Sequence, residues 1–207
     1  MAKNDKEEIG NLDKKKLILA EGVDAKFFLI HLLHKKRIDD IKVLNFGGIK
    51  ELTKFICTLK SIEGFDDVSS IIIFRDSEKS AQSASESIND SIKTTNLITR
   101  IIKPFTISNQ NGRNIGFGLF PGIDENGKLY EDGTLEHLCL RLFTENSNNA
   151  IIKTYIEDFQ TKNAKFRRAH KNELHALFSF TDKYVGLKIG ETARDGGFDF
   201  VPFLRAG

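Results

Sequence analysis

The chain has 207 residues, of which 40% are apolar and 29% are charged. This length fits one domain whose core folds without disulfides, and the composition excludes a disordered chain and a membrane protein. Thirty-one Lys and Arg residues face twenty-nine Asp and Glu residues, and the formal net charge of +2 excludes a strongly basic, histone-like binder of nucleic acid. It still permits a local basic groove beside an acidic site.

The first residues are charged and polar. Met1 to Lys16 contains no apolar segment of the kind found in signal peptides, so we expect a cytoplasmic protein without a membrane partner. We expect residues 1–15 to form a flexible charged arm and residues 16–207 to form a single domain. Cys57 and Cys139 have apolar neighbours and no CxxC or HxxxH spacing, which predicts two buried thiols and no zinc site.

Residues 16–95 alternate between short apolar runs and segments in which apolar residues have helical spacing. The apolar runs predict buried strands at Lys16–Ala20, Ile41–Phe46 and Val68–Phe74. The other segments predict helices at Val23–Lys36, Ile49–Ile62 and Lys79–Thr95. Three successive strand–helix units predict an α/β fold with a mostly parallel central sheet flanked by helices.

The pattern changes after residue 97. Ile98–Ser108 and Asn114–Phe120 predict two strands joined by an Asn-Gly turn, and a polar loop follows from Pro121 to Gly133. From about residue 134 the chain is helical again, and Thr134 is suited to cap the first helix of this region. The C-terminal addition is predicted to consist of helices at Thr134–Phe143, Asn149–Gln160, Ala164–Phe180 and Tyr184–Arg194.

Acidic residues stand directly after two of the predicted strands. Glu21-Gly22 follows the first strand, Gly47-Gly48 the second and Asp76-Ser77-Glu78 the third. Right-handed crossovers bring the carboxyl ends of parallel strands to one edge of the sheet, where ligands of such folds bind. Carboxylates gathered there repel each other unless a cation joins them, and an all-oxygen ligand set suits Mg²⁺ or Mn²⁺. One alternative stays open: Asp76 caps the following helix, and Glu21 lies at a helix N-terminus because of the helix dipole.

These strand ends resemble the Toprim pattern shared by topoisomerases, primases, recombination proteins and OLD-family nucleases. The pattern reads Leu17-Ile18-Leu19-Ala20-Glu21-Gly22, then Asn45-Phe46-Gly47-Gly48, then Ile71-Ile72-Ile73-Phe74-Arg75-Asp76-Ser77-Glu78. Downstream, Phe117–Gly122, Thr134–Leu138, Lys171–Leu177 and Tyr184–Gly190 are similar to segments of small bacterial proteins with the DUF3226 Toprim-like domain. Together the similar segments extend over residues 16 to 203.

The resemblance implies a Toprim-like (Rossmannoid) fold with a Mg²⁺-dependent phosphoryl-transfer site. Glu21 would bind metal or act as a general base. Asp76 would be a main metal ligand, and Glu78 would fill the second acidic position of the third motif. Asp24 and Glu136 would help to hold a second metal ion.

The same resemblance gives Lys171 the role of neutralising the charge that develops on the phosphate. Lys171 also ends the densest basic segment of the chain, Lys165 to Lys171. This segment is expected to be either a solvated helix face or a surface that contacts phosphates.

We therefore expect a Mg²⁺- or Mn²⁺-dependent nuclease that hydrolyses phosphodiester bonds of DNA or RNA. Small Toprim nucleases resemble the effectors of phage-defence or toxin systems. Because the sequence contains no Walker A motif, a separate partner ATPase is a further expectation, as is self-association into a homo-oligomer.

Two other functions stay open. A degenerate Toprim module that binds nucleic acid or a partner ATPase without cleavage is favoured by the Asp-x-Glu form of the third motif and by Ala25 after Asp24. A primase-like polymerase would need template-handling domains for which 207 residues leave little room.

Overall fold

A five-stranded sheet organises the computed structural model, which describes residues 9–143, 149–162 and 169–200. The strand order is β2-β1-β3-β5-β4, and all neighbours are parallel except β4 and β5. The predicted α/β class with a mostly parallel central sheet is therefore confirmed. The strands are β1 (Lys16–Ala20), β2 (Ile41–Asn45), β3 (Ser70–Asp76), β4 (Ile107–Gln110) and β5 (Arg113–Phe120).

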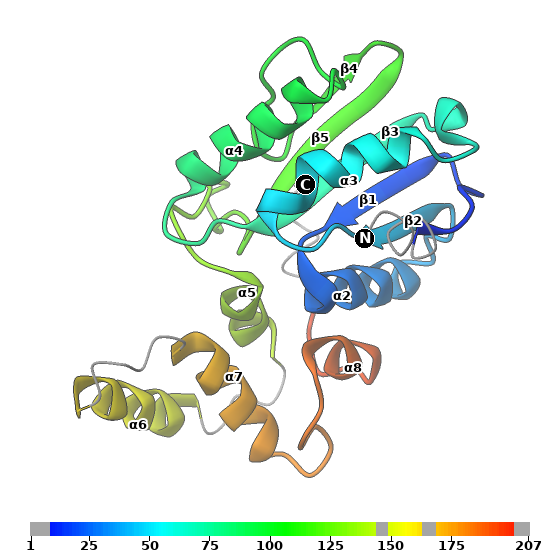
Figure 1. Cartoon of the computed structure of the whole chain (residues 1–207). Coiled ribbons are helices and arrows are strands. Elements are labelled where there is room, and N and C mark those ends of the chain that lie inside the picture. Colours follow the sequence, from blue (N-terminus) through cyan, green and yellow to red (C-terminus); the bar gives the residue numbers. More distant parts are fainter. Residues whose placement is uncertain (1–8, 144–148, 163–168, 201–207) are drawn as a thin grey trace.

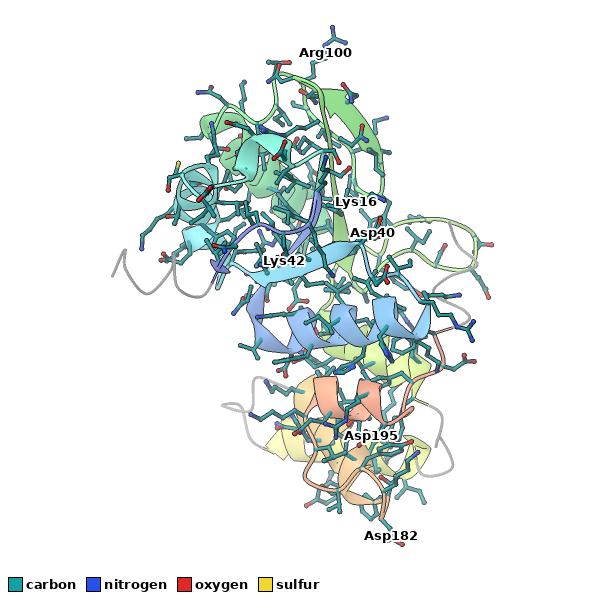
Figure 2. The ribbon with its side chains drawn as sticks, turned by 90° about the vertical axis from the view of Figure 1, so that its right-hand side faces the viewer. Lys16, Asp40, Lys42, Arg100, Asp182 and Asp195 are labelled. Atoms are coloured by element: carbon teal, nitrogen blue, oxygen red, sulfur yellow. The ribbon has the colours of Figure 1, made fainter. Side chains whose placement is uncertain are left out.

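Helices cover both faces of the sheet (Figure 1). Helices α3 and α4 pack on one face, whereas α2 packs on the other and separates the sheet from α8 (Figures 1 and 2). None of the helices in the described ranges is long and apolar enough to cross a bilayer. The helices are α2 (Gly22–Lys35), α3 (Ile49–Lys60), α4 (Ala81–Thr94), α5 (Leu135–Leu142), α6 (Asn149–Lys162), α7 (Ala169–Ser179) and α8 (Ile189–Arg194).

Strand β3 shows why the sheet has two cores. Its side chains point alternately to the two faces, so Ile71 and Ile73 are buried under α3 and α4. Ile72 and Phe74 lie on the other face, against the core formed with α2, α5, α7 and α8. The central strand of a parallel sheet is covered on both faces, which explains its run of β-branched residues.

The first hairpin strand is shorter than predicted. Of the expected strand Ile98–Ser108, only Ile107 and Ser108 belong to the sheet, as the first half of β4. Side chains replace the strand ladder before it: Gln110 Oε1 accepts hydrogen bonds from the backbone of Thr99 and Arg100 at 2.7 and 3.0 Å. Asn89 bonds to both backbone groups of Ile102 at 2.9 and 3.0 Å. These amides satisfy the backbone without a neighbouring strand.

The described part of the predicted arm packs against the domain. Ile9 is 2% exposed and belongs to the core under α3 and α4, with Leu12 packed against it. The carbonyl of Lys15 accepts a hydrogen bond of 2.8 Å from the backbone of Ser69. Residues 9–15 are therefore not a free arm, because two apolar side chains attach them to the core.

One of the two predicted buried thiols is exposed. Cys139 is completely buried, as expected, whereas Cys57 lies on the solvent face of α3. Helix α3 buries Leu52, Ile56 and Leu59, which share one face, and Cys57 is one step of about 100° away from Ile56. Apolar neighbours in the sequence did not specify the face.

The C-terminal helices agree with the predicted order. Helix α5 begins one residue after Thr134, its predicted cap. Helix α7 begins at Ala169 in the described residues, and the predicted positions 164–168 lie outside them. Helix α8 is shorter than predicted, because Tyr184 to Lys188 forms turns. Gly190 allows α8 to lie close to α2, since a Cβ there would be 2.4 Å from that of Phe27.

Candidate functional site

Glu21 follows β1 and holds the start of α3. Its Oε1 accepts a hydrogen bond of 3.0 Å from the backbone N–H of Ile49, the first residue of that helix. The turn after Glu21 is fixed by Asn45, whose Oδ1 accepts from Gly22 at 3.0 Å and from Gly47 at 2.9 Å. Both glycines have positive φ, of 84° and 81°, which other residues adopt only with strain. The Gly motifs thus fix the direction of the Glu21 side chain.

Arg75 lies beside Glu21, and sequence reasoning gave it no role. The register pairs Ala20 with Phe74, so the next residues of both strands are neighbours on the same face of the sheet. Arg75 Nε is 3.3 Å from Glu21 Oε2 and donates a 3.1 Å hydrogen bond to the carbonyl of Asp76. Glu21 Oε2 is buried and accepts no hydrogen bond, so its partner is the charge of Arg75 alone.

Asp76 ends β3 on the opposite face and holds the start of α5. Its Oδ1 accepts a hydrogen bond of 2.8 Å from the backbone N–H of Leu135, the first residue of α5. The cap of α4 is instead Ser80, which accepts from Ser83 N at 3.2 Å. The open alternative that Asp76 caps the following helix is therefore wrong, because Ser80 caps α4 and the Asp76 carboxylate accepts instead from the first residue of α5.

Burial raises the pKa of Asp76 to about 7, and the charges of Glu136, Glu21 and Glu78 act in the same direction. The Leu135 N–H opposes these effects, since it stabilises the ionised carboxylate. Among the described residues, no Lys, Arg or His forms an ion pair with Asp76, whereas Glu21 has Arg75. Asp76 therefore lacks a counter-charge among the described residues.

Helix α5 brings Glu136 to the same neighbourhood. The pKa of the buried Cys139 thiol is raised by burial and then by the charges of Glu136, Asp24 and Asp76, so these three carboxylates lie around one side chain. Lys171 Nζ is 3.9 Å from Glu136 Oε1. Glu136 and Lys171, which are distant in sequence from the strand ends, thus lie near Asp76 and Asp24.

Glu78 is placed at this edge by two backbone hydrogen bonds with Gly133, both of 2.8 Å. Its φ of 56° lies in the left-handed region, which the bridge to Gly133 maintains. The side chain is exposed, and it is close enough to Asp76 for its charge to raise the pKa of that carboxyl.

Two histidines stand beside Glu136 and Lys171. The rings of His137 and His170 have centroids 4.3 Å apart. His137 Nδ1 accepts a hydrogen bond of 3.1 Å from Thr134 N, and burial lowers the pKa of this ring, as does the charge of His170. The pair therefore helps to dock α7 against α5.

The predicted acids are grouped by this fold into one edge, which we call the acidic edge: Glu21, Asp24, Asp76, Glu78 and Glu136. Within the described ranges, no three Asp, Glu, His or Cys side chains are arranged as a ready metal cage. Most of the predicted basic segment, including Lys165, lies outside the described residues, so of the strongly basic side chains there only Lys171 can be placed.

Arg75 and Asn45 are the residues that sequence reasoning missed. A signal for Arg75 exists in the sequence: it has the same strand parity as Ile71 and Ile73, so the buried face of β3 continues through it.

Three solved structures are similar to the chain at a low level. A hypothetical protein from Pyrococcus horikoshii OT3 is 14% identical with a TM-score of 0.49, over 88% of this chain and 87% of that one. Two structures of the C-terminal region of the Xanthomonas campestris pv. campestris OLD protein are 14% identical, with TM-scores of 0.35 and 0.36. They cover 93% and 94% of this chain and 76% and 78% of their own. Similarity of this size carries no argument about activity.

No curated protein matches the chain at a significant level. A family model described as "Protein of unknown function (DUF3226)" matches residues 15–193, which include both sheet faces and all residues of the acidic edge. The protein belongs to the DUF3226 family.

Proposed function

We propose that this protein is a Mg²⁺- or Mn²⁺-dependent nuclease that hydrolyses phosphodiester bonds of DNA or RNA. The observation that carries the proposal is the acidic edge, where Asp76 is surrounded by the charges of Glu21, Glu78 and Glu136 and has no counter-charge among the described residues. Such a group is costly in a folded protein unless it binds a cation or a proton. The resemblance of the strand-end motifs to the Toprim pattern supports phosphoryl transfer as the reaction.

The donor chemistry of the acidic edge fits a hard divalent cation. All candidate ligands are carboxylates, which Mg²⁺ and Mn²⁺ prefer. Asp76, Glu136 and Asp24 would hold the cation, with the charge of Glu78 close to Asp76. Asp76 has one oxygen engaged with Leu135 N and a second oxygen for the cation. A cation bound there would lower the pKa of a bound water and polarise the phosphate.

The chain's own residues would supply the remaining steps. We assign the general-base role to Glu21 on its resemblance to the glutamate of the Toprim pattern, and its Oε2 accepts no hydrogen bond from a described residue. Lys171, 3.9 Å from Glu136, would offset the negative charge that develops on the phosphate.

The test is metal-dependent cleavage. The protein is incubated with supercoiled plasmid, linear duplex DNA, single-stranded DNA and RNA, with Mg²⁺, Mn²⁺ or EDTA. We expect cleavage with either cation and none with EDTA. Asp76→Asn should lower the rate at least 100-fold, which corresponds to about 2.7 kcal/mol of transition-state free energy. Asp40→Asn is the matched control, because Asp40 pairs with Lys16 at a distance of 2.6 Å (both are labelled in Figure 2). Lys16 begins β1, whereas Glu21 follows the other end of this strand. Equal cleavage by Asp76→Asn and the unchanged protein would contradict the site assignment.

A catalytically degenerate module is the second candidate. It is favoured by the lack of a ready metal cage among the described side chains and by the Asp-x-Glu form of the third motif. Salt-sensitive binding of nucleic acid without cleavage under any of these conditions would support it. A partner ATPase and a homo-oligomer remain proposals, which co-purification and light scattering test directly.

A further inference from the structure

Arg75 is the only buried arginine among the described residues, with 7% of its surface exposed. Only one of its side-chain nitrogens is used by the protein: Nε donates to the carbonyl of Asp76 and lies 3.3 Å from Glu21 Oε2. The two terminal nitrogens, Nη1 and Nη2, donate no hydrogen bond to any described residue, and neither is among the fully buried atoms that lack a partner. The end of this buried guanidinium is therefore not fully enclosed and has no hydrogen-bond acceptor among the described residues.

Two other arginines of the described chain use their terminal nitrogens. Arg113 Nη2 donates to the carbonyl of Phe65 at 3.0 Å, and Arg141 Nη2 donates to that of Pro121 at 2.7 Å. Both side chains are thereby fixed to the backbone as structural ties. Arg75 differs, because its Nε side is held and its terminal side is free.

The Arg75 side chain lies beside Glu21, a member of the acidic edge. Arg75 is next to Glu21, whose carboxylate holds the first N–H of α3, and the preceding Gly48 leaves that helix start uncrowded, since a Cβ there would meet no atom within 4 Å. A planar guanidinium with two free terminal nitrogens binds a phosphate in bidentate fashion. Lys171, by contrast, already has Glu136 as its partner.

We propose that Arg75 binds a phosphate group of the substrate through Nη1 and Nη2, while Glu21 and the Asp76 carbonyl hold its Nε side in place. The inference rests on the proposed function in that the phosphate belongs to DNA or RNA. The free phosphate ion has the same chemistry and is a second source of the ligand. Arg75 would act from one face of the sheet and the carboxylates around Asp76 from the other.

The experiment measures binding apart from cleavage. Fluorescence anisotropy follows a labelled single-stranded DNA and a labelled RNA with Ca²⁺ in place of Mg²⁺, and calorimetry follows inorganic phosphate. The variants are Arg75→Gln, Arg75→Lys and the matched control Arg113→Gln, which removes an arginine near the opposite end of β3. Mn²⁺ titration and circular dichroism of each variant report the cation site and the fold.

Arg75→Gln should weaken oligonucleotide binding at least tenfold and reduce the slope of log Kd against log salt by about one. The Mn²⁺ affinity of Arg75→Gln should change less than threefold. A general loss of structure would instead abolish Mn²⁺ binding as well. Arg75→Lys keeps the positive charge but loses the planar pair of terminal nitrogens, so its oligonucleotide affinity should lie between those of the unchanged protein and of Arg75→Gln. If Arg75→Gln does not fold, the affinity of Arg75→Lys tests the inference. Arg113→Gln should bind within threefold of the unchanged protein.

Binding of oligonucleotide and of phosphate that are both unaffected in the Arg75 variants would overturn the inference, even where cleavage establishes the nuclease. The absence of any binding of oligonucleotide and of phosphate by the unchanged protein would overturn it as well. Arg75-dependent binding without cleavage would uphold the inference and refute the proposed nuclease. Weakened phosphate binding with unchanged oligonucleotide binding would assign Arg75 to a free phosphate ion and contradict its role in nucleic-acid binding.

Discussion

Asp76 Oδ1 accepts a hydrogen bond of 2.8 Å from the backbone N–H of Leu135, a residue 59 positions later in the chain. This bond joins the end of β3 to the start of the helix that carries Glu136. Glu21 does the same on the other face of the sheet, at 3.0 Å from Ile49 N. Each strand-end carboxylate therefore fixes a helix with one oxygen, while its second oxygen accepts no hydrogen bond from a described residue.

The first prediction concerns the pH dependence of stability. Asp76 has a pKa of about 7 in the folded protein against an ordinary 3.8, so the folded state retains a proton that the unfolded state has lost between these values. Its contribution to stability is fully present below pH 4 and is lost as the pH rises through 7. Asp76→Asn keeps the acceptor for Leu135 N and removes the titration. In EDTA it should be more stable than the unchanged protein at pH 8, by up to about 4 kcal/mol, and equal to it at pH 4.

Urea unfolding at pH 4, 6 and 8 measures this difference. Asp40→Asn is the control of opposite sign, because the hydrogen bond from Lys16 lowers the pKa of Asp40. Its contribution is present above pH 4 and is lost as the pH falls, so this variant should never gain stability at pH 8. A stability of Asp76→Asn that follows the unchanged protein at every pH would contradict the raised pKa.

The second prediction concerns cation binding to the folded state. A cation that binds only the folded chain stabilises it by about 2.7 kcal/mol at one hundred times its Kd. For a chain of this size the melting temperature should rise by about 5 to 10 °C with Mn²⁺ at pH 8. Scanning calorimetry should show this rise for the unchanged protein and for Asp40→Asn. Asp76→Asn should lose most of it and Glu136→Gln part of it; an equal rise in Asp76→Asn would place the cation elsewhere.

The third prediction tests how β5 supports the site. Gly118 has no side chain, and a Cβ there would lie 2.4 Å from the ring of Phe74, the residue before Arg75. Gly118→Ala should therefore displace that ring and cost about 1–3 kcal/mol of stability. Gly48→Ala is the matched control, since its Cβ would meet nothing within 4 Å, and should cost less than 1 kcal/mol. Urea unfolding of both variants compares them, and equal losses would show that the Phe74 contact is unimportant.

Much of the fold follows from local pattern. The strand Lys16–Ala20 was predicted with its observed bounds, and the Asn111-Gly112 turn has φ of 53° and 79°, as an Asn-Gly hairpin turn requires. The grouping of Glu21 and Asp76 followed from the parallel topology, which needs only strand order and handedness. These features depend on neighbouring residues or on general rules of chain geometry.

The features that escaped prediction depend on contacts between distant segments. A charged residue at the end of a strand is usually solvated, and Arg75 is buried because the register with β1 sets Glu21 beside it. The link between Asp76 and Leu135 spans a loop whose path the sequence does not specify. Cys57 was misplaced because its helix face, and not its apolar neighbours, determines exposure.

The fourth prediction uses this difference between the two cysteines. Cys139 is completely buried and burial raises the pKa of its thiol, so it should not react in the folded protein. Cys57 is exposed and should react. Titration with a disulfide reagent should modify one thiol in buffer and two in guanidinium chloride. Cys57→Ser is the control, which should leave no reactive thiol in buffer; a reactive thiol in that variant would mean that the core around α5 opens.

The last prediction separates the two roles of Lys171. Its Nζ lies 3.9 Å from Glu136 Oε1 and its side chain is 36% exposed, so Lys171→Gln should change stability by less than about 1 kcal/mol. The substitution also releases Glu136 from a competing positive charge, so Mn²⁺ should bind about two- to threefold more tightly. If Lys171 also offsets charge on the phosphate, the cleavage rate should fall at least tenfold although the cation binds better. Calorimetry and single-turnover cleavage measure the two effects separately. A rate that rises together with Mn²⁺ affinity would make Lys171 only a partner of Glu136 and leave the phosphate to Arg75.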